Sequence, residues 1–271
     1  MQLAHLAGRE APLAVVQDGR VAPLADRVGI ATVDELIASG VDVADAATQA
    51  LAEAQPLQPG MLARPLLAPG NIACVGLNYE DHIRETGLDR PERPLIFAKL
   101  TSSLLGPDEE IRWPAGLTTS VDWEAELAVV IGRRMSGVSV DDALDHAFGY
   151  TAANDVSARD LQKSDGQWGR AKGYDTFCPV GPAVRNGLDW RGLEVIGRVN
   201  GQERQRAAAS GMHFPIPTLV SFISGIMTLE PGDLIATGTP AGVGPLHDGD
   251  VVEVEIPGVG VLSNPVRDGT Q

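Results

Sequence analysis

Two glutamates, Glu124 and Glu126, stand two residues apart in the segment VDWEAELAVVIG, residues 121–132. In a β-strand, this spacing places both side chains and Asp122 on one face, while the apolar run 127–131 continues into a core. Their Cα atoms then lie about 6.5–7 Å apart. Two such carboxylates at the mouth of a core are costly without a partner, so a bound cation is expected. The alternative is the solvated face of an edge strand.

A second pair that could take part in catalysis is His82 and Glu85, in the segment GLNYEDHIRETG, residues 76–87. The segment is typical of a loop followed by one or two helical turns that end at Gly87. Residues three apart on a helix face the same side, so the imidazole and the carboxylate are expected to meet. A histidine beside a carboxylate can act as a general base toward water. A surface helix with an incidental histidine is the alternative.

The surrounding elements indicate a chain of mixed α and β structure in two parts. The N-terminal part predicts a hairpin at Asp18-Gly19 and two helices after it. A stretch rich in proline and glycine, 56–70, marks a linker. We therefore expect a small N-terminal α/β domain at residues 1–68 and a catalytic domain at residues 69–271.

Apolar runs downstream predict six strands, at 72–75, 94–99, 150–154, 177–184, 193–199 and 251–256. Ser139 is expected to cap a helix that runs to about Phe148 and ends at Gly149, and a second helix is expected at 217–229. Asp155 follows a predicted strand and precedes a short helix. Functional side chains are common at such junctions.

The composition argues against several classes of protein. The net charge of −15 argues against nucleic acid or an anionic membrane as the partner. Neither a signal peptide nor an apolar run of about 18 residues is apparent, so we expect a cytoplasmic protein that spans no membrane. Cys74 and Cys178 are predicted to be buried thiols, and the glycine-rich loop 238–244 matches no nucleotide-binding pattern. Lysine is scarce: the chain holds only Lys99, Lys163 and Lys172.

Six segments, in order, resemble the fumarylacetoacetate hydrolase family: GLNYEDHIRE, FAKLTSSLLGP, VDWEAELAVVIG, GYTAANDVSARDLQ, AKGYDTFCPVGP and LEPGDLIATGTPAGVG. The resemblance implies an α+β fold with a mixed β-sheet roll as the catalytic domain, usually in a homodimer. It also implies a site for Mg²⁺ or Mn²⁺ made by Glu124, Glu126 and Asp155. Three carboxylates without cysteine or histidine are indeed the oxygen ligands that suit these hard ions, and they leave coordination positions open for a chelating α-keto acid.

The same resemblance implies residues that handle the substrate. Lys172 matches the family lysine that holds the keto acid and stabilises its enolate. Arg159, Gln162 and Thr239 match positions that contact the substrate carboxylate or carbonyl, and Lys99 matches a further substrate position.

The expected reaction is hydrolytic cleavage of a C–C bond in a 2,4-dioxo acid of the acylpyruvate type. The metal serves as Lewis acid, and His82, oriented by Glu85, serves as the base that deprotonates water. Two alternatives remain open. One is decarboxylation of a β-keto acid or isomerisation of a dienedioate on the same metal site, and the other is a relative that binds a keto acid without catalysis. In every case the expected partner is a small anionic keto acid.

Overall fold

The structure is a computed structural model that describes residues 1–269. Its strands are β1 (Gln2–Leu6), β2 (Leu13–Gln17), β3 (Arg20–Pro23), β4 (Gln55–Pro56), β5 (Leu62–Ala63), β6 (Ile72–Gly76), β7 (Leu95–Lys99), β8 (Leu104–Leu105), β9 (Ile111–Trp113), β10 (Val121–Trp123), β11 (Ala125–Ile131), β12 (Ala147–Asn154), β13 (Ser157–Ala158), β14 (Cys178–Arg185), β15 (Glu194–Val199), β16 (Gln202–Ala208), β17 (Leu234–Ala236), β18 (Gly244–Pro245), β19 (Val251–Ile256) and β20 (Gly260–Asp268).

The helices of the described residues are short. They are α1 (Ala25–Val28), α2 (Val33–Ser39), α3 (Ala44–Ala52), α4 (Glu80–Thr86), α5 (Arg159–Asp165), α6 (Gly169–Lys172) and α7 (Ile216–Ser224), with 3₁₀ turns η1 (Thr101–Ser103), η2 (Ala143–His146), η3 (Trp190–Gly192) and η4 (Ala209–Gly211). No helix in this part of the chain is long and apolar enough to cross a membrane.

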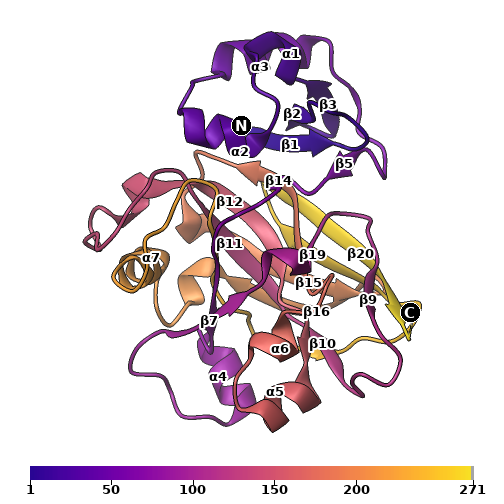
Figure 1. Ribbon diagram of the computed structural model, residues 1–271, viewed down its shortest axis with the longest axis vertical. Coiled ribbons are helices and arrows are strands. Elements are labelled where there is room, and N and C mark those ends of the chain that lie inside the picture. The colour runs from indigo at the N-terminus through magenta and orange to yellow at the C-terminus, as the bar shows by residue number, and fades with distance from the viewer. Residues whose placement is uncertain (270–271) are drawn as a thin grey trace.

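The N-terminal part is built on the predicted hairpin. Asp18 and Gly19 join β2 to β3 with positive φ angles of 50° and 69°, as a two-residue hairpin turn requires. The hydroxyl of Thr32 accepts the N–H of Glu35 and caps α2. β1, which the sequence pattern did not predict, pairs with β2 on one side and with β14 on the other. One continuous sheet therefore joins the N-terminal part to the rest of the chain (Figure 1).

Within residues 1–269 the strands form three sheets. The largest runs β4-β3-β2-β1-β14-β12-β11-β17-β6-β7, with β5 beside β1 and β8 beside β14. It is mixed, because β17 and β6 are parallel whereas β11 and β12 are antiparallel. β11 is buried along its whole length, as its apolar run predicts. A second sheet, β16-β15-β19-β20-β9, packs against it and encloses the main core. This is the α+β fold with a mixed sheet that was expected.

Two predictions of local structure are wrong. The helix expected from Ser139 to Phe148 is a turn followed by η2 and by the start of β12. Gly149 does not end a helix. It lies inside β12, where a Cβ atom would collide with the carbonyl oxygen of Arg185 on β14. The segment 121–132 is also two strands rather than one, because β10 and β11 pair in different sheets.

The other elements lie close to their expected positions. All six strands predicted downstream of the linker are present, and the helix expected at 217–229 is the shorter α7. α4 ends at Gly87, which has the expected left-handed conformation. Cys74 and Cys178 are free and buried. Figure 1 shows α4, α5 and α6 gathered at the end of the molecule opposite the N-terminal helices.

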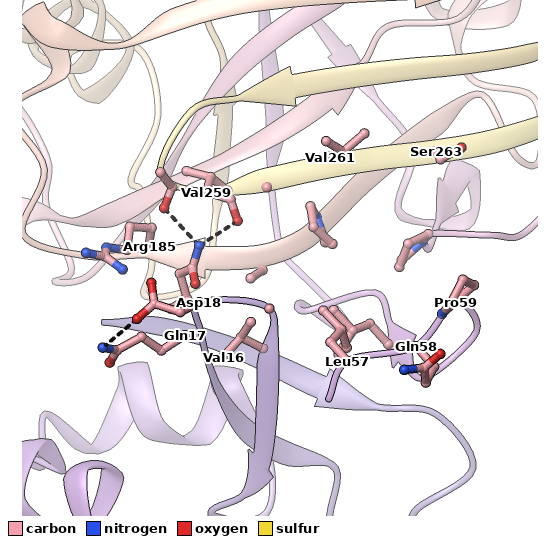
Figure 2. Close-up of a pocket in the computed structure, with 18 of the residues that line it drawn as sticks. Val16, Gln17, Asp18, Leu57, Gln58, Pro59, Arg185, Val259, Val261 and Ser263 are labelled. Atoms are coloured by element: carbon pink, nitrogen blue, oxygen red, sulfur yellow. Dashed lines mark hydrogen bonds between the residues drawn. The ribbon is translucent and has the colours of Figure 1, made fainter. Parts of the chain in front are cut away.

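A cavity of about 720 Å³ lies between the N-terminal part and the C-terminal strands (Figure 2). Leu57 and Gln58 line one side, and Arg185 and Val259 line the other. Gln2 also lines the cavity, and its amide donates a hydrogen bond to the Val259 carbonyl at 3.1 Å, which links the two sides. The described residues that line this cavity include none of the ten predicted site residues, which lie elsewhere in the fold.

Candidate active site

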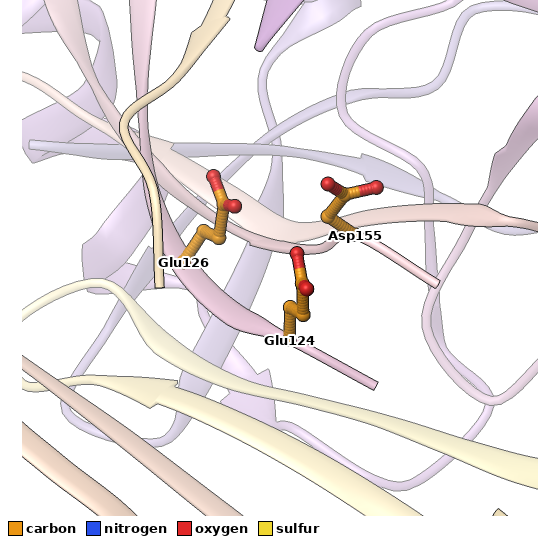
Figure 3. A group of neighbouring side chains, drawn as sticks. All are labelled: Glu124, Glu126 and Asp155. Atoms are coloured by element: carbon orange, nitrogen blue, oxygen red, sulfur yellow. The ribbon is translucent and has the colours of Figure 1, made fainter. Parts of the chain in front are cut away.

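The three predicted metal ligands converge in the structure. Glu124 lies at the break between β10 and β11, Glu126 lies in β11, and Asp155 directly follows β12. The register that pairs Ala125 with Asn154 brings the start of β11 beside the end of β12. The three carboxylates therefore point into one space (Figure 3). One oxygen of each lies within 4.8 Å of the others, and all three side chains are buried.

Two of these carboxylates face cations. The ammonium group of Lys172 lies 2.5 Å from Asp155 and 3.2 Å from Glu124. The guanidinium group of Arg159 also pairs with Glu124. Burial opposes ionisation of Glu124, yet Lys172 and Arg159 hold its pKa below the ordinary value. Burial likewise opposes the charge of Lys172, but Asp155 and Glu124 raise the pKa of this lysine.

Glu126 has no such partner. Among the described residues it forms no ion pair, and its Oε2 accepts the N–H of Gly238 at 2.9 Å. Burial, together with Asp155 and Glu124, raises the pKa of Glu126 well above its ordinary value. The cluster holds four carboxylates and three cations: Asp122, Glu124, Glu126 and Asp155 against Lys99, Arg159 and Lys172. One negative charge is left over when all of these groups are ionised, so the cluster attracts a cation.

Asp155 Oδ1 is a second feature that fits a metal ion. This oxygen is buried and accepts no hydrogen bond from the described residues. Lys99 Nζ lies only 2.7 Å away, but its three protons already go to three backbone carbonyls. A buried acceptor without a donor is costly. The oxygen donors and the surplus charge thus fit Mg²⁺ or Mn²⁺ held by the three acidic side chains.

A cavity of about 500 Å³ opens onto this cluster. Seven of the ten predicted site residues line it: His82, Glu124, Glu126, Arg159, Gln162, Lys172 and Thr239. The other three lie directly behind its wall. Glu85 contacts His82, Asp155 contacts Lys172, and Lys99 contacts Asp155. The side chain of Lys99 is only 1% exposed. It therefore positions Asp155, and direct contact with a substrate is not what this geometry favours.

His82 and Glu85 form the expected pair on α4. His82 Nδ1 lies 2.9 Å from Glu85 Oε2, so Nδ1 donates to the carboxylate and Nε2 is the nitrogen with a free lone pair. Glu85 Oε1 accepts the N–H of Gly242 at 2.9 Å. At Gly242, φ is 103°, and a Cβ atom would collide with the Arg204 carbonyl, so glycine is required there. The pair is thus fixed against the loop 238–244.

The residues predicted to contact the substrate also form hydrogen bonds within the protein. Arg159 donates to Asp122 at 2.8 Å and to Gln162 at 2.9 Å. The hydroxyl of Thr239 donates to a carbonyl of β11 at 2.9 Å and accepts the amide of Gln205 at 2.8 Å. One lone pair of Thr239 remains for a ligand. Arg159 and Gln162 hold each other in place at the cavity wall.

Three residues that the sequence patterns did not identify complete the site. Asn154 accepts the N–H of Glu124 at 3.0 Å and fixes the strand break. Ser157 accepts a hydrogen bond from Lys172 at 2.7 Å. Gln205 accepts the N–H of the first residue of β11 at 2.9 Å and holds Thr239. Asn154 and Ser157 flank Asp155, a position that could have drawn attention, whereas nothing near Gln205 in the sequence marks it.

Replacing Glu126 by glutamine tests the surplus charge in the metal-free protein. A raised carboxyl pKa means that the folded protein binds this proton more tightly than the unfolded chain. The wild type therefore loses stability as the pH rises above the ordinary value of 4.5. Glutamine removes this loss and can still accept the Gly238 hydrogen bond. In EDTA at pH 8 we expect Glu126→Gln to be more stable by about 1–3 kcal/mol, seen as a higher Tm in thermal unfolding.

The pH dependence is the informative part of that measurement. The gain in Tm should shrink as the pH is lowered from 8 toward 5, because the wild-type carboxyl becomes protonated. Glu253→Gln, an outward-facing residue of β19, is the matched control and should change Tm little at either pH. A Tm for Glu126→Gln at or below that of wild type at pH 8 would contradict the charge balance derived above.

Known proteins are similar to this chain over most of its length. Residues 71–267 match the family model described as fumarylacetoacetate (FAA) hydrolase C-terminal. The mitochondrial oxaloacetate tautomerase fahd2 of Xenopus laevis is 44% identical over 217 residues, which cover 76% of this chain and 68% of that protein.

Two solved structures extend the similarity to almost the whole fold. The fumarylacetoacetate hydrolase of Exiguobacterium antarcticum is 37% identical, with a TM-score of 0.87 and 99% of each chain covered. The maleylpyruvate hydrolase of Sphingobium sp. SYK-6, solved with manganese(II) and pyruvate, is 32% identical, with a TM-score of 0.84 and 100% of each chain covered. By sequence and by fold, the chain belongs to the fumarylacetoacetate hydrolase family.

Proposed function

We propose that this protein is a hydrolase that depends on a divalent metal and cleaves a C–C bond of a 2,4-dioxo acid of the acylpyruvate type. The observation that carries the proposal is the His82–Glu85 pair, 2.9 Å apart, in which His82 lines the cavity onto which Glu124 and Glu126 open. Hydrolysis needs a base for water beside the group that binds the keto acid. A family member that shifted a double bond would have less need of such a pair.

The acidic cluster supplies the first part of the mechanism. Glu124, Glu126 and Asp155 would hold Mg²⁺ or Mn²⁺, which, when bound, supplies Lewis-acid polarisation of the α-keto acid end of the substrate. The open side of the cluster faces the cavity, so the keto acid can enter there. The three converging carboxylates and the surplus negative charge of the cluster support binding of Mg²⁺ or Mn²⁺ there.

The remaining residues move protons and stabilise charge. His82 Nε2 takes a proton from water, Glu85 stabilises the resulting imidazolium, and the hydroxide adds to the distal carbonyl carbon. The bond between C3 and C4 then breaks. C4 leaves with the added hydroxyl as a carboxylic acid, and the electron pair of the C3–C4 bond stays on C3 as the enolate of pyruvate. The ammonium group of Lys172 stabilises that enolate. Protonation of C3 by His82 gives pyruvate and restores the free base.

Keto–enol tautomerisation is the second candidate. The relative named oxaloacetate tautomerase, at 44% identity, favours it. The same His82 could carry a proton between C3 and the enol oxygen without any water. Oxaloacetate is also a β-keto acid, so loss of carbon dioxide from it belongs to the same comparison.

A parallel assay distinguishes these reactions. Acetylpyruvate, oxaloacetate and a 2-hydroxydienedioate are each incubated with the Mg²⁺- or Mn²⁺-loaded protein, and pyruvate, enol absorbance and carbon dioxide are measured. We expect acetylpyruvate to yield pyruvate and acetate at about 1 s⁻¹ or faster, and no turnover after EDTA treatment. Tautomerisation of oxaloacetate without cleavage of any substrate would overturn the hydrolase in favour of the tautomerase. No turnover at all by the metal-loaded protein would favour a binding protein.

A further inference from the structure

All three lysines of the chain are found at this one site. Lys99 and Lys172 are buried beside the acidic cluster. Lys163, to which the proposed mechanism gives no role, lines the same cavity from α5 and is exposed at its mouth. In a chain with a net charge of −15, the one lysine outside the buried cluster is thus at the entrance to the site.

The position of Lys163 on α5 follows from helical spacing. Arg159, Gln162 and Lys163 are residues i, i+3 and i+4, so they share one face of the helix, and all three line the cavity. α5 has no buried residue. It is a surface helix of which one polar face borders the cavity.

The acidic side chains of α5 are already engaged elsewhere. Asp160 accepts hydrogen bonds from Thr118 and Thr119, and Asp165 accepts two from Arg170, at 2.6 and 2.7 Å. No carboxylate of the described residues pairs with Lys163. Its charge is therefore available to a ligand.

The other cations of the cavity differ in this respect. Arg159 pairs with Asp122 and Glu124, and Lys172 pairs with Glu124 and Asp155. Both cations thus have carboxylate partners within the acidic cluster and lie at that end of the cavity. An anionic group that reaches the cavity mouth would therefore meet Lys163 as its one unpaired cation among the described lining residues.

An apolar wall also lines the cavity. Phe97 and Trp168 meet edge to face, with ring centroids 5.1 Å apart, and Leu88 adds to this wall. A cavity of about 500 Å³ has room for more than a small acylpyruvate. A ligand that fits the cavity thus carries an α-keto acid at the cluster, a hydrocarbon segment along the rings and an anion at the mouth.

We infer that Lys163 selects oxo-dicarboxylic acids over oxo-monocarboxylic acids by binding the distal carboxylate. This rests on the proposed function, because the α-keto acid end must lie at the acidic cluster. Lys163 is a specificity residue in this role and takes no part in bond cleavage.

A pair of acids that differ only at the distal end tests the inference. 2,4-Dioxoheptanedioate and 2,4-dioxoheptanoate have the same carbon chain, and only the first carries a second carboxylate. Their dissociation constants are measured by calorimetry on the Mn²⁺-loaded protein, and KM and kcat are measured where cleavage occurs. Lys163→Met should weaken binding of the diacid about tenfold, the lower range for a charge-assisted hydrogen bond at an exposed site. The affinity for the monoacid and kcat should stay within about twofold.

Two further variants control for charge and for folding. Lys163→Arg should restore most of the diacid affinity. Arg133→Met removes the same charge from an exposed residue that does not line the cavity and should leave the affinity for both acids unaffected. Raising the salt concentration should weaken diacid binding by wild type more than by Lys163→Met.

The outcomes separate this inference from the proposed function. Equal losses for both acids in Lys163→Met, or no loss for either, would overturn the role of Lys163 whether or not the protein cleaves them. Binding of both acids without cleavage would overturn the hydrolase, while a selective loss of diacid binding would still support Lys163 as the specificity residue.

Discussion

Replacing Glu126 by glutamine is expected to weaken Mn²⁺ binding by more than tenfold and to lower turnover of a keto acid by on the order of 10³-fold. Glu126 is the one carboxylate of the three that forms no ion pair with the described residues, so its charge is the most available to a divalent ion. The amide is nearly the same size and can still accept the N–H of Gly238. Calorimetric titration with Mn²⁺ and steady-state kinetics measure the two effects.

Glu126→Gln is a clearer test of the metal site than a substitution of Asp155. Removing the charge of Asp155 would leave Lys99 and Lys172 buried without their shared partner, at a cost of about 3–5 kcal/mol, so loss of activity could reflect unfolding. Glu126→Gln is expected to fold at least as well as wild type. Wild-type affinity for Mn²⁺ in this variant would refute the three-carboxylate metal site, and Glu253→Gln again serves as the matched control.

Replacing His82 by alanine is expected to lower kcat for hydrolysis by about 10²–10⁴, the contribution of a general base. Metal binding should survive, because His82 is not among the three converging ligands. The measurement is kcat with saturating Mn²⁺, together with a Mn²⁺ titration of the same preparation. His247→Ala, an exposed histidine that does not line the cavity, should keep wild-type turnover. Unchanged turnover in His82→Ala would remove the pair on α4 from the mechanism.

Local spacing was sufficient to predict much of the site. Strand spacing predicted that Glu124 and Glu126 point the same way, and they do converge, although Glu124 lies at the break between β10 and β11 and not within one continuous strand. His82 and Glu85 meet because helix residues three apart face the same side. Asp155 was placed at a strand-to-helix junction, and the structure brings it to the two glutamates. These relations depend on backbone geometry over a few residues, which the sequence largely determines.

Relations between distant segments were not predictable in this way. The pairing of β1 with β14 joins residues about 180 positions apart and has no local signal. Gly149 looked like a helix end, but it is needed where β12 approaches β14 closely. The resemblance implied that Arg159 contacts the substrate, and no local pattern indicated its partners within the protein. It pairs with Asp122 and Glu124, more than thirty residues earlier in the chain. Charge partners depend on which strands meet, and the fold decides that.

The loop 238–244 has a consequence for how the protein would lose activity. One of its N–H groups binds Glu126, at the ion site, and another binds Glu85, which orients the base. A displacement of the loop would therefore break both hydrogen bonds and impair ion binding and the base together. Partial inactivation by heat or denaturant should then yield a mixture of fully competent and fully inactive molecules. The number of active sites found by titration would fall in proportion to the total activity, while kcat per remaining active site would stay unchanged.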